Sequence, residues 1–310
     1  MNILYVGCMS PHYRTEVYVT HALRKLGHTV KTVEVRGCRE RSLYQFADKI
    51  NADFVLLSKS GHAWYNRFLE RCRRRNLLTV TWLWDLYWGY RRPNLHHMRA
   101  EMLLTTDGGH DERWKEIDVK DHQVLRQGIH EPEAVMYEPN YKYDVGFVGT
   151  PTSHRVRSRM VRFLRDTYGL GDRYTEITDA RGLQLNERLA EVKVIVGDSY
   201  PTDNYWSNRI YEIIGRGGFF MHPKTVGMKK EFKHGLHYVS FEACNHKQLK
   251  TDIDFWIKNN DLRENIKKTG FEHVKNNLTY EHRCKDLIER VQKHMQRKRL
   301  LEAVKLMAAE

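Results

Sequence analysis

A polar cluster stands beside two glycines in the stretch SNRIYEIIGRGGFFM. If residues 205–216 form a helix, Asn208 and Glu212 lie four positions apart and therefore share one face of it. A carboxylate near the start of a helix is suited to accept two hydrogen bonds from a ribose diol. The pair Gly217-Gly218 would end the helix and let the backbone run close to a ligand. An ordinary glycine-ended helix with a surface glutamate is the alternative.

A second set of residues follows a strand-like segment in YDVGFVGTPTSHRVRS, where Gly149 stands in a loop before a predicted helix. This helix begins near His154 and Arg155. Loop amides, the positive end of a helix and a guanidinium together form a cradle for a diphosphate. Arg159 and Arg162 continue the stripe of Arg155 and are interpreted as an exposed basic face.

In the first half of the chain, polar residues also follow apolar strand-like runs. Asp85 comes directly after such a run, where a buried carboxylate would be costly without a partner. His62, after Gly61, is a candidate for contacting a sugar hydroxyl, and a structural histidine is the alternative. The aromatic and basic segment at 82–92 is of the kind that stacks on bases or sugar rings, although core packing explains at least Trp82.

The composition is that of a folded protein, with 41% hydrophobic and 29% charged residues in 310. A net charge of +13 favours polyanionic partners: nucleic acid, an anionic membrane face or phosphorylated small molecules. The five cysteines form no CxxC pair, and the histidines show no HExxH spacing, so we expect no disulfide framework and no metal site. No apolar run could span a membrane and no leader precedes the first strand, so we expect a cytoplasmic protein.

Short strands alternate with helices through both halves of the chain, which predicts an α/β protein with two parallel sheets. Pro139 and Asn140 interrupt the pattern, and a new strand begins at about residue 145. We therefore predict a first Rossmann-like domain at 1–141 and a second at 142–285. A C-terminal helix at 286–310 would cross back to the first domain. In such sheets, ligands bind beyond the carboxyl ends of the strands.

The second half resembles the glycosyltransferases of the spore maturation protein CgeB type, which have the GT-B fold and are related to glycosyltransferase family 4. The resemblance covers most of residues 144–290, and the first half adds only ILYVG and QGI. It is carried by four motifs in the family's order: DVGFVGTPTSHR, SNRIYEIIGRGGFFM, FKHGLHYVSF and NNDLRENIKKTGFEHVKNNLTYEHR.

The resemblance implies that the domain at 1–141 binds the acceptor and that the domain at 142–285 binds the nucleotide-sugar donor. It also implies roles for residues at the matching positions. Glu212 would hold the ribose of a nucleoside diphosphate sugar, with UDP the expected nucleotide, and Arg155 would face the diphosphate. Asn208 and Arg209 would line the donor pocket. The glycines at 149, 217 and 218 would let the backbone approach the ligand.

One position departs from the pattern of the retaining relatives, which carry two glutamates eight residues apart. Here Asn204 stands eight residues before Glu212. The neutral amide could still contact the sugar, but the stereochemical outcome stays open. No DxD motif ends a strand, in keeping with metal-independent transfer and with no tightly bound cofactor.

The implied activity is transfer of a sugar from a nucleoside diphosphate sugar to a hydroxyl group, with Asp85 or His62 positioning or deprotonating the acceptor. The basic charge favours a polyanionic acceptor, and a modified base in DNA is the leading hypothesis, with the host cytoplasm as the location if the gene is phage-borne. A surface or spore polysaccharide is the second hypothesis. An inactive GT-B scaffold that binds nucleic acid is the third. The oligomeric state stays open.

Overall fold

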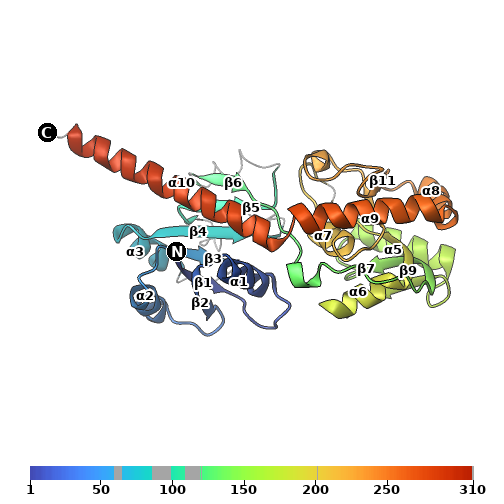
Figure 1. Cartoon of the computed structure of the whole chain (residues 1–310), viewed down its shortest axis with the longest axis horizontal. Coiled ribbons are helices and arrows are strands. Elements are labelled where there is room, and N and C mark those ends of the chain that lie inside the picture. Colours follow the sequence, from blue (N-terminus) through green and yellow to red (C-terminus); the bar gives the residue numbers. More distant parts are fainter. Residues whose placement is uncertain (59–64, 86–98, 109–118, 120, 201, 309–310) are drawn as a thin grey trace. The chain divides into compact units, whose positions relative to one another are not determined.

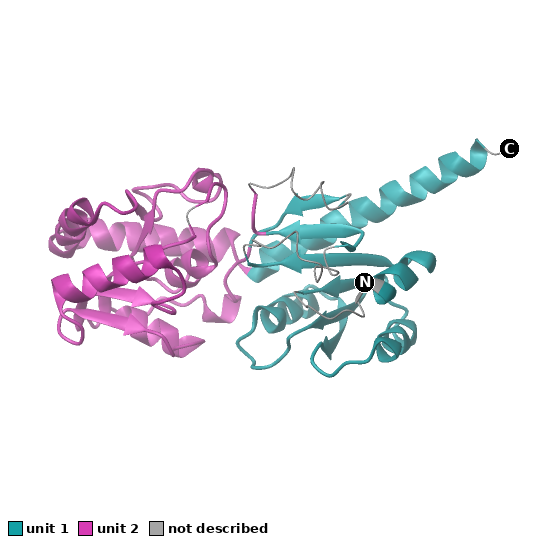
Figure 2. Ribbon diagram, turned by 180° about the vertical axis from the view of Figure 1, so that it is seen from behind, with its two compact units in different colours: residues 1–105, 110–126, 280–310 teal, residues 106–109, 127–279 magenta. Residues whose placement is uncertain are grey.

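The structure is a computed structural model, and it describes residues 1–58, 65–85, 99–108, 119, 121–200 and 202–308. The chain divides into two compact α/β units, which Figure 2 shows in separate colours. Unit 1 comprises residues 1–105, 110–126 and 280–310, and unit 2 comprises residues 106–109 and 127–279. These limits differ from the domain boundaries drawn from the sequence after residues 141 and 285.

Unit 1 contains a six-stranded sheet with the order β2-β1-β3-β4-β5-β6, in which every neighbouring pair is parallel. Its strands are β1 (Asn2–Gly7), β2 (Thr29–Glu34), β3 (Phe54–Leu57), β4 (Leu78–Leu83), β5 (Met102–Thr105) and β6 (His122–Val124). Ile3 pairs with Val30 on one side and with Phe54 on the other. Because the central strands are covered on both faces, they read as unbroken apolar runs.

Helices cover both faces of this sheet (Figure 1). They are α1 (Thr15–Lys25), α2 (Glu40–Lys49), α3 (Tyr65–Arg74) and α10 (Tyr280–Met307). Residues of α1 and α10 share one core cluster with Ile3 and Tyr5, while α2 and α3 pack against Leu4 and Val6 on the other face. The last helix of the chain therefore packs on the sheet formed by its first residues.

Unit 2 contains a five-stranded parallel sheet with the order β11-β10-β9-β7-β8. Its strands are β7 (Tyr143–Val148), β8 (Tyr174–Ile177), β9 (Val192–Val196), β10 (Phe220–Pro223) and β11 (Val239–Phe241). Its helices are α5 (Arg155–Tyr168), α6 (Leu183–Ala190), α7 (Arg209–Ile214), α8 (His246–Lys258) and α9 (Asn260–Asn277), with 3-10 turns η2 (Glu131–Glu133) and η3 (Met228–Lys230).

The two faces of this second sheet carry separate cores. Residues of α5 and α8 pack with Val194 and Val196, whereas residues of α6 and α7 pack with Val192 and Ile195. The predicted α/β class with two parallel sheets is confirmed.

The helix expected at 205–216 is shorter than predicted, because α7 begins at Arg209. Asn204 adopts a positive φ of 57° and donates its backbone N–H to the Val226 carbonyl. The backbone N–H of Ser207 donates a hydrogen bond to the Ser199 hydroxyl at 3.0 Å. These contacts hold the preceding residues out of the helical path.

Candidate functional site

In unit 2, the direction of strand addition reverses between the neighbouring strands β7 and β9. The chain leaves β7 toward β8 on one side and returns to β9 on the other side of β7. In open α/β sheets, ligands bind outside the carboxyl ends of the strands at such a switch point. Gly149 follows β7 at this edge, and Asp198 follows β9.

Asp198 holds two arginines from different elements. Its carboxylate is buried, with 2% of the side chain exposed. Oδ1 accepts a hydrogen bond from Arg157 Nε at 2.8 Å and lies 3.3 Å from Arg209 Nη1, which also donates to the Asp198 carbonyl at 2.9 Å. Arg157 comes from α5 and Arg209 from α7. One carboxylate thus fixes two guanidinium groups at the edge of the sheet.

A histidine completes this Asp198 cluster, which consists of Asp198, Arg157, Arg209 and His154. The Nδ1 atom of His154 accepts the backbone N–H of Arg157 as the N-cap of α5, and Nε2 lies 2.9 Å from Asp198 Oδ2. Burial is the main cause that lowers the pKa of His154, and the pull of Asp198 only partly opposes it. The ring is therefore neutral at pH 7, with its proton on Nε2, which faces the carboxylate.

The guanidinium of Arg209 lies against Gly149, in the glycine loop that follows β7. Gly149 has a φ of +114°, and a Cβ atom there would stand 2.9 Å from Arg209 Nη2. Only glycine combines this backbone conformation with the space that the guanidinium takes. Burial and the nearby Arg157 lower the pKa of Arg209 to about 10, so the group stays protonated at neutral pH. The cluster has two fixed positive charges and one negative charge, a surplus suited to an anion.

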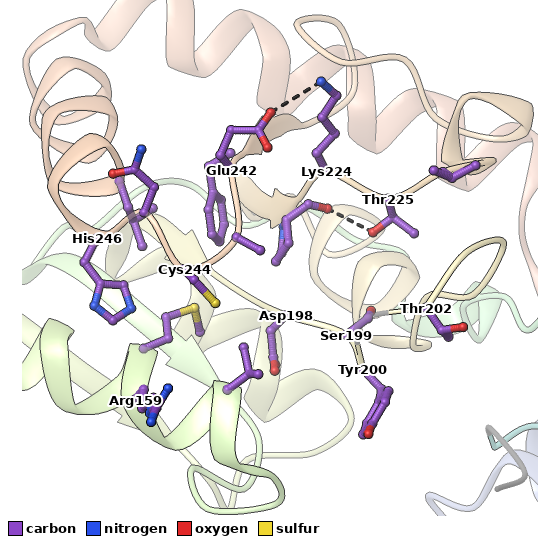
Figure 3. A pocket seen from close by; sticks show the side chains of 18 of the residues that line it. Arg159, Asp198, Ser199, Tyr200, Thr202, Lys224, Thr225, Glu242, Cys244 and His246 are labelled. Carbon is purple, nitrogen blue, oxygen red and sulfur yellow. Dashed lines mark hydrogen bonds and ion pairs between the residues drawn. The ribbon is translucent and has the colours of Figure 1, made fainter.

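A cavity of about 400 Å³ begins at Asp198 and runs along the carboxyl ends of β9, β10 and β11 (Figure 3). Its wall includes Met160 of α5, Phe241 at the end of β11 and Leu249 of α8, which belong to the α5–α8 face. Arg159, Tyr200 and the Lys224–Glu242 ion pair supply polar groups. A ligand over the edge at Asp198 could extend into this cavity.

His222 holds the loop after β9 in place through a hydrogen bond with Ser199. Its Nε2 lies 2.8 Å from the Ser199 hydroxyl, and its Nδ1 lies 2.8 Å from the Pro223 carbonyl. Since only a protonated nitrogen can donate to a carbonyl, Nδ1 carries the proton and Ser199 donates to Nε2. Burial lowers the pKa of His222 to about 4, which agrees with a neutral ring.

Glu212 lies on α7, three residues after Arg209. Its carboxylate Oε2 accepts a hydrogen bond from Arg216, whose other terminal nitrogen donates to Glu133. Arg216 is buried, with 1% of its side chain exposed, while Glu212 keeps 17%.

The glycines after this helix have a packing role. A Cβ at Gly217, where φ is +77°, would meet Met136 Cγ at 2.3 Å, and one at Gly218 would meet Ile213 Cγ2 at 2.7 Å. The protein's own side chains fill the space beside both residues. Their contact with a ligand stays a prediction.

Other residues predicted for the donor site take varied positions. Arg155 is the exposed first residue of α5, and Asn208 is the N-cap residue of α7 without a side-chain capping bond. The backbone of Asn204 is bonded on both sides, because its carbonyl accepts from Gly108 and its N–H donates to Val226. The structure brings Arg209 and Gly149 into contact, and no contact joins Arg155 to Glu212.

Of the predicted acceptor residues, the structure describes Asp85, which follows β4. Asp85 is exposed, so the burial cost that singled it out does not arise. His62 and most of the aromatic segment at 82–92 lie outside the described residues, although Trp82 is buried and its Nε1 donates to the Leu125 carbonyl. Their catalytic and binding roles remain predictions.

Sequence reasoning missed the centre of the cluster, Asp198 and Arg157. A signal for each was present. Asp198 comes two residues after the apolar strand VKVIV, and Arg157 is in register with Met160, Leu164 and Tyr168 on the buried stripe of α5. Within the described residues, no group of three or more histidine, cysteine or acidic side chains is arranged to hold a metal ion.

The comparisons with known proteins concern both the sequence and the fold. A family described as glycosyl transferase-like matches residues 155–289, which is less than half of the chain. No curated protein matches the sequence. An alpha-glucosyltransferase in complex with UDP-glucose and DNA containing an abasic site superposes with a TM-score of 0.72 at 11% identity, covering 94% of this chain and 99% of that one.

Two further solved structures are similar to this chain in fold. A glycosyltransferase from Rickettsia africae has a TM-score of 0.66 at 14% identity, with 94% and 98% of the chains covered. The Anabaena protein Alr3699/HepE in complex with UDP has a TM-score of 0.66 at 10% identity, with 94% and 100% covered.

The chain has the GT-B fold of glycosyltransferases. The matched region begins at Arg155 and includes α7, so it spans most of the GT-B unit that carries the Asp198 cluster. Fold and sequence match together support a glycosyltransferase enzyme. In the part of the chain that the structure describes, no helix is long and apolar enough to cross a membrane.

Proposed function

We propose that this protein transfers a sugar from a UDP-sugar to a hydroxyl group of a polyanionic acceptor, with a modified base in DNA as the leading candidate. The Asp198 cluster is the observation that carries the donor half. It holds a protonated guanidinium beside the glycine loop at the switch point of unit 2. A diphosphate is the group that such a site binds.

In the reaction, the bond between the sugar's anomeric carbon and the β-phosphate oxygen breaks, and a bond to the acceptor oxygen forms. The acceptor's proton passes to a base, and UDP leaves with added negative charge on its diphosphate. Arg209 and the amides at the start of α5 would stabilise this charge, a preorganised effect worth several kcal/mol. Glu212 would hold the ribose, and Arg155, exposed at the first position of α5, would approach the diphosphate from solvent.

The acceptor proposal has two supports. The net charge of +13 suits phosphate contacts that supply affinity without sequence preference. A structure with the same fold contains both UDP-glucose and DNA, and that is a property of the other protein which we extend to this chain. A polysaccharide acceptor and a scaffold without activity are the competing outcomes.

Release of glucose from UDP-glucose, followed with and without acceptor, tests the proposal. We expect slow hydrolysis without acceptor, and transfer to DNA that contains hydroxymethylated bases. Arg209→Met should abolish both, while Arg165→Met, which breaks an exposed ion pair with Glu176 on the same unit, should not.

Product on a glycan but not on DNA would overturn the acceptor proposal. Absence of both hydrolysis and transfer, with DNA binding retained, would identify the inactive scaffold.

A further inference from the structure

We propose that Arg216 is the positioning residue for Glu212, and that it sets the protein's preference for a ribonucleotide with an intact ribose diol. This inference rests on the proposed function, in which Glu212 holds the donor ribose. Arg216 lies two residues after the end of α7 and four residues after Glu212.

The contacts of Arg216 fix both the side chain and the backbone of Glu212. One terminal nitrogen, Nη1, donates to Glu212 Oε2 and lies 3.2 Å from the Glu212 carbonyl oxygen. No described residue donates to the other carboxylate oxygen, Oε1, so it keeps its capacity to accept a bond. A free glutamate would have to be ordered when a ligand binds, and that ordering costs free energy.

The second terminal nitrogen of Arg216 donates to Glu133, which is itself rigidly placed. The side-chain amide of Asn186, on α6, donates to the carbonyls of Glu133 at 2.9 Å and of Val135 at 2.6 Å. Asn186 is buried, with 1% exposed. Arg216 therefore connects Glu212 to η2, whose backbone is held by Asn186 of α6.

The glycines around Arg216 restrict its backbone. Gly215 is packed so closely that a Cβ would meet Ile129 Cδ1 at 2.7 Å, and Met136 fills the corresponding space at Gly217. The guanidinium thus starts from an immobile backbone and ends between two carboxylates. Lysine cannot reproduce this arrangement, because an ammonium group lacks the planar fork that reaches two partners.

Binding of UDP and of 2′-deoxy-UDP, each measured by calorimetry, tests this inference. A carboxylate that accepts a bond from the 2′-hydroxyl should make UDP bind roughly tenfold more tightly than its deoxy analogue. We expect this ratio to fall to about twofold or less in Arg216→Met, and to an intermediate value in Arg216→Lys. Loss of fold alone would weaken both ligands equally and leave the ratio in place.

Three other variants complete the design. Glu212→Ala should abolish the preference, which identifies Glu212 as its source. Glu133→Gln should give an intermediate ratio, because the glutamine oxygen still accepts from Arg216. Arg165→Met, the matched loss of another arginine–glutamate pair in unit 2, should keep the wild-type ratio.

The outcomes separate the two proposals. A wild-type protein that binds no UDP would overturn the proposed function and this inference with it. A wild-type protein that prefers UDP, while Arg216→Met and Arg216→Lys keep the full ratio, would overturn the role of Arg216 alone.

Discussion

At the switch point of unit 1, between β1 and β3, the buried carboxylate of Glu16 accepts hydrogen bonds from the Ser58 hydroxyl at 3.0 Å and the Cys8 N–H at 3.3 Å. At the switch point of unit 2, between β7 and β9, the buried carboxylate of Asp198 instead holds Arg157 and Arg209. The same kind of acidic group at the same topological place has two consequences. In unit 1 it fixes the backbone of a loop, and in unit 2 it fixes cations.

The difference shows why a shared architecture does not by itself locate a donor site. An anion needs uncompensated positive charge, which the Asp198 cluster has. The carboxylates beside β1 are surrounded by amides, since Glu34 also accepts the N–H of Met9 at 2.8 Å. The proposed diphosphate site therefore lies in unit 2.

The largest effect is expected for Asp198→Asn. Two buried guanidinium groups would lose their compensating charge, which costs about 3 kcal/mol in the free energy of unfolding. For a unit of this size, we expect the melting temperature to fall by roughly 10 °C. Asp144→Asn is the control, because Asp144 also pairs with two cations, Arg173 and Lys193, but at a more exposed place. Equal shifts in both variants would contradict the special role of Asp198.

The second prediction concerns binding. Arg209→Met should weaken UDP binding about 100-fold, since charge-assisted hydrogen bonds to the diphosphate are lost. Calorimetry with UDP measures this change, and Arg165→Met serves as the control. An unchanged affinity in Arg209→Met would place the diphosphate elsewhere.

The third prediction separates backbone strain from displacement of Arg209. Gly149→Ala and Gly171→Ala both place a side chain at positive φ, of +114° and +85°, and each should lose about 1 kcal/mol of stability. Only at residue 149 would the new Cβ collide with Arg209, because nothing lies within 4 Å of it at residue 171. UDP affinity should therefore fall about tenfold in Gly149→Ala and stay unchanged in Gly171→Ala. The same loss of UDP affinity in both variants would contradict the explanation that Gly149→Ala acts by displacing Arg209.

The smallest effect is expected at Glu16. Burial raises the pKa of Glu16 above its ordinary value, and the hydrogen bonds from Ser58 and Cys8 only partly oppose this. A carboxyl group with a raised pKa contributes stability that is full below its unfolded pKa and is lost as the pH rises through its folded pKa. Relative to Glu16→Gln, the wild type should thus lose stability as the pH rises from 4 to 7.

Urea unfolding of both proteins across this pH range measures that difference. UDP binding should be the same in both, because the group lies in unit 1. Weaker UDP binding in Glu16→Gln would contradict the division of tasks between the units.

Much of the fold followed from the sequence, because buried parallel strands are apolar throughout and the chain between them has helical periodicity. The order of most strands and helices along the chain was accessible in this way. The four-residue strand β8, with the sequence YTEI, escaped notice because it is short and includes a charged residue.

The candidate site was only partly predictable. Gly149 was predicted from its place after a strand, and Glu212 from its place on a helix that ends at two glycines. The position of a charged residue in the sequence does not show which residue it pairs with. Arg155 and Arg157 are two residues apart, and only the register of Arg157 with the apolar stripe of α5 marks it as the buried one. Likewise, the bond between Arg216 and Glu133 joins residues 83 positions apart.

A crystal structure of the protein with UDP tests the central claim most directly. The account predicts the diphosphate between Gly149 and Arg209 at the carboxyl edge of unit 2, with the ribose hydroxyls against Glu212. A nucleotide bound beside Glu16 and Ser58, at the edge of unit 1, would contradict it.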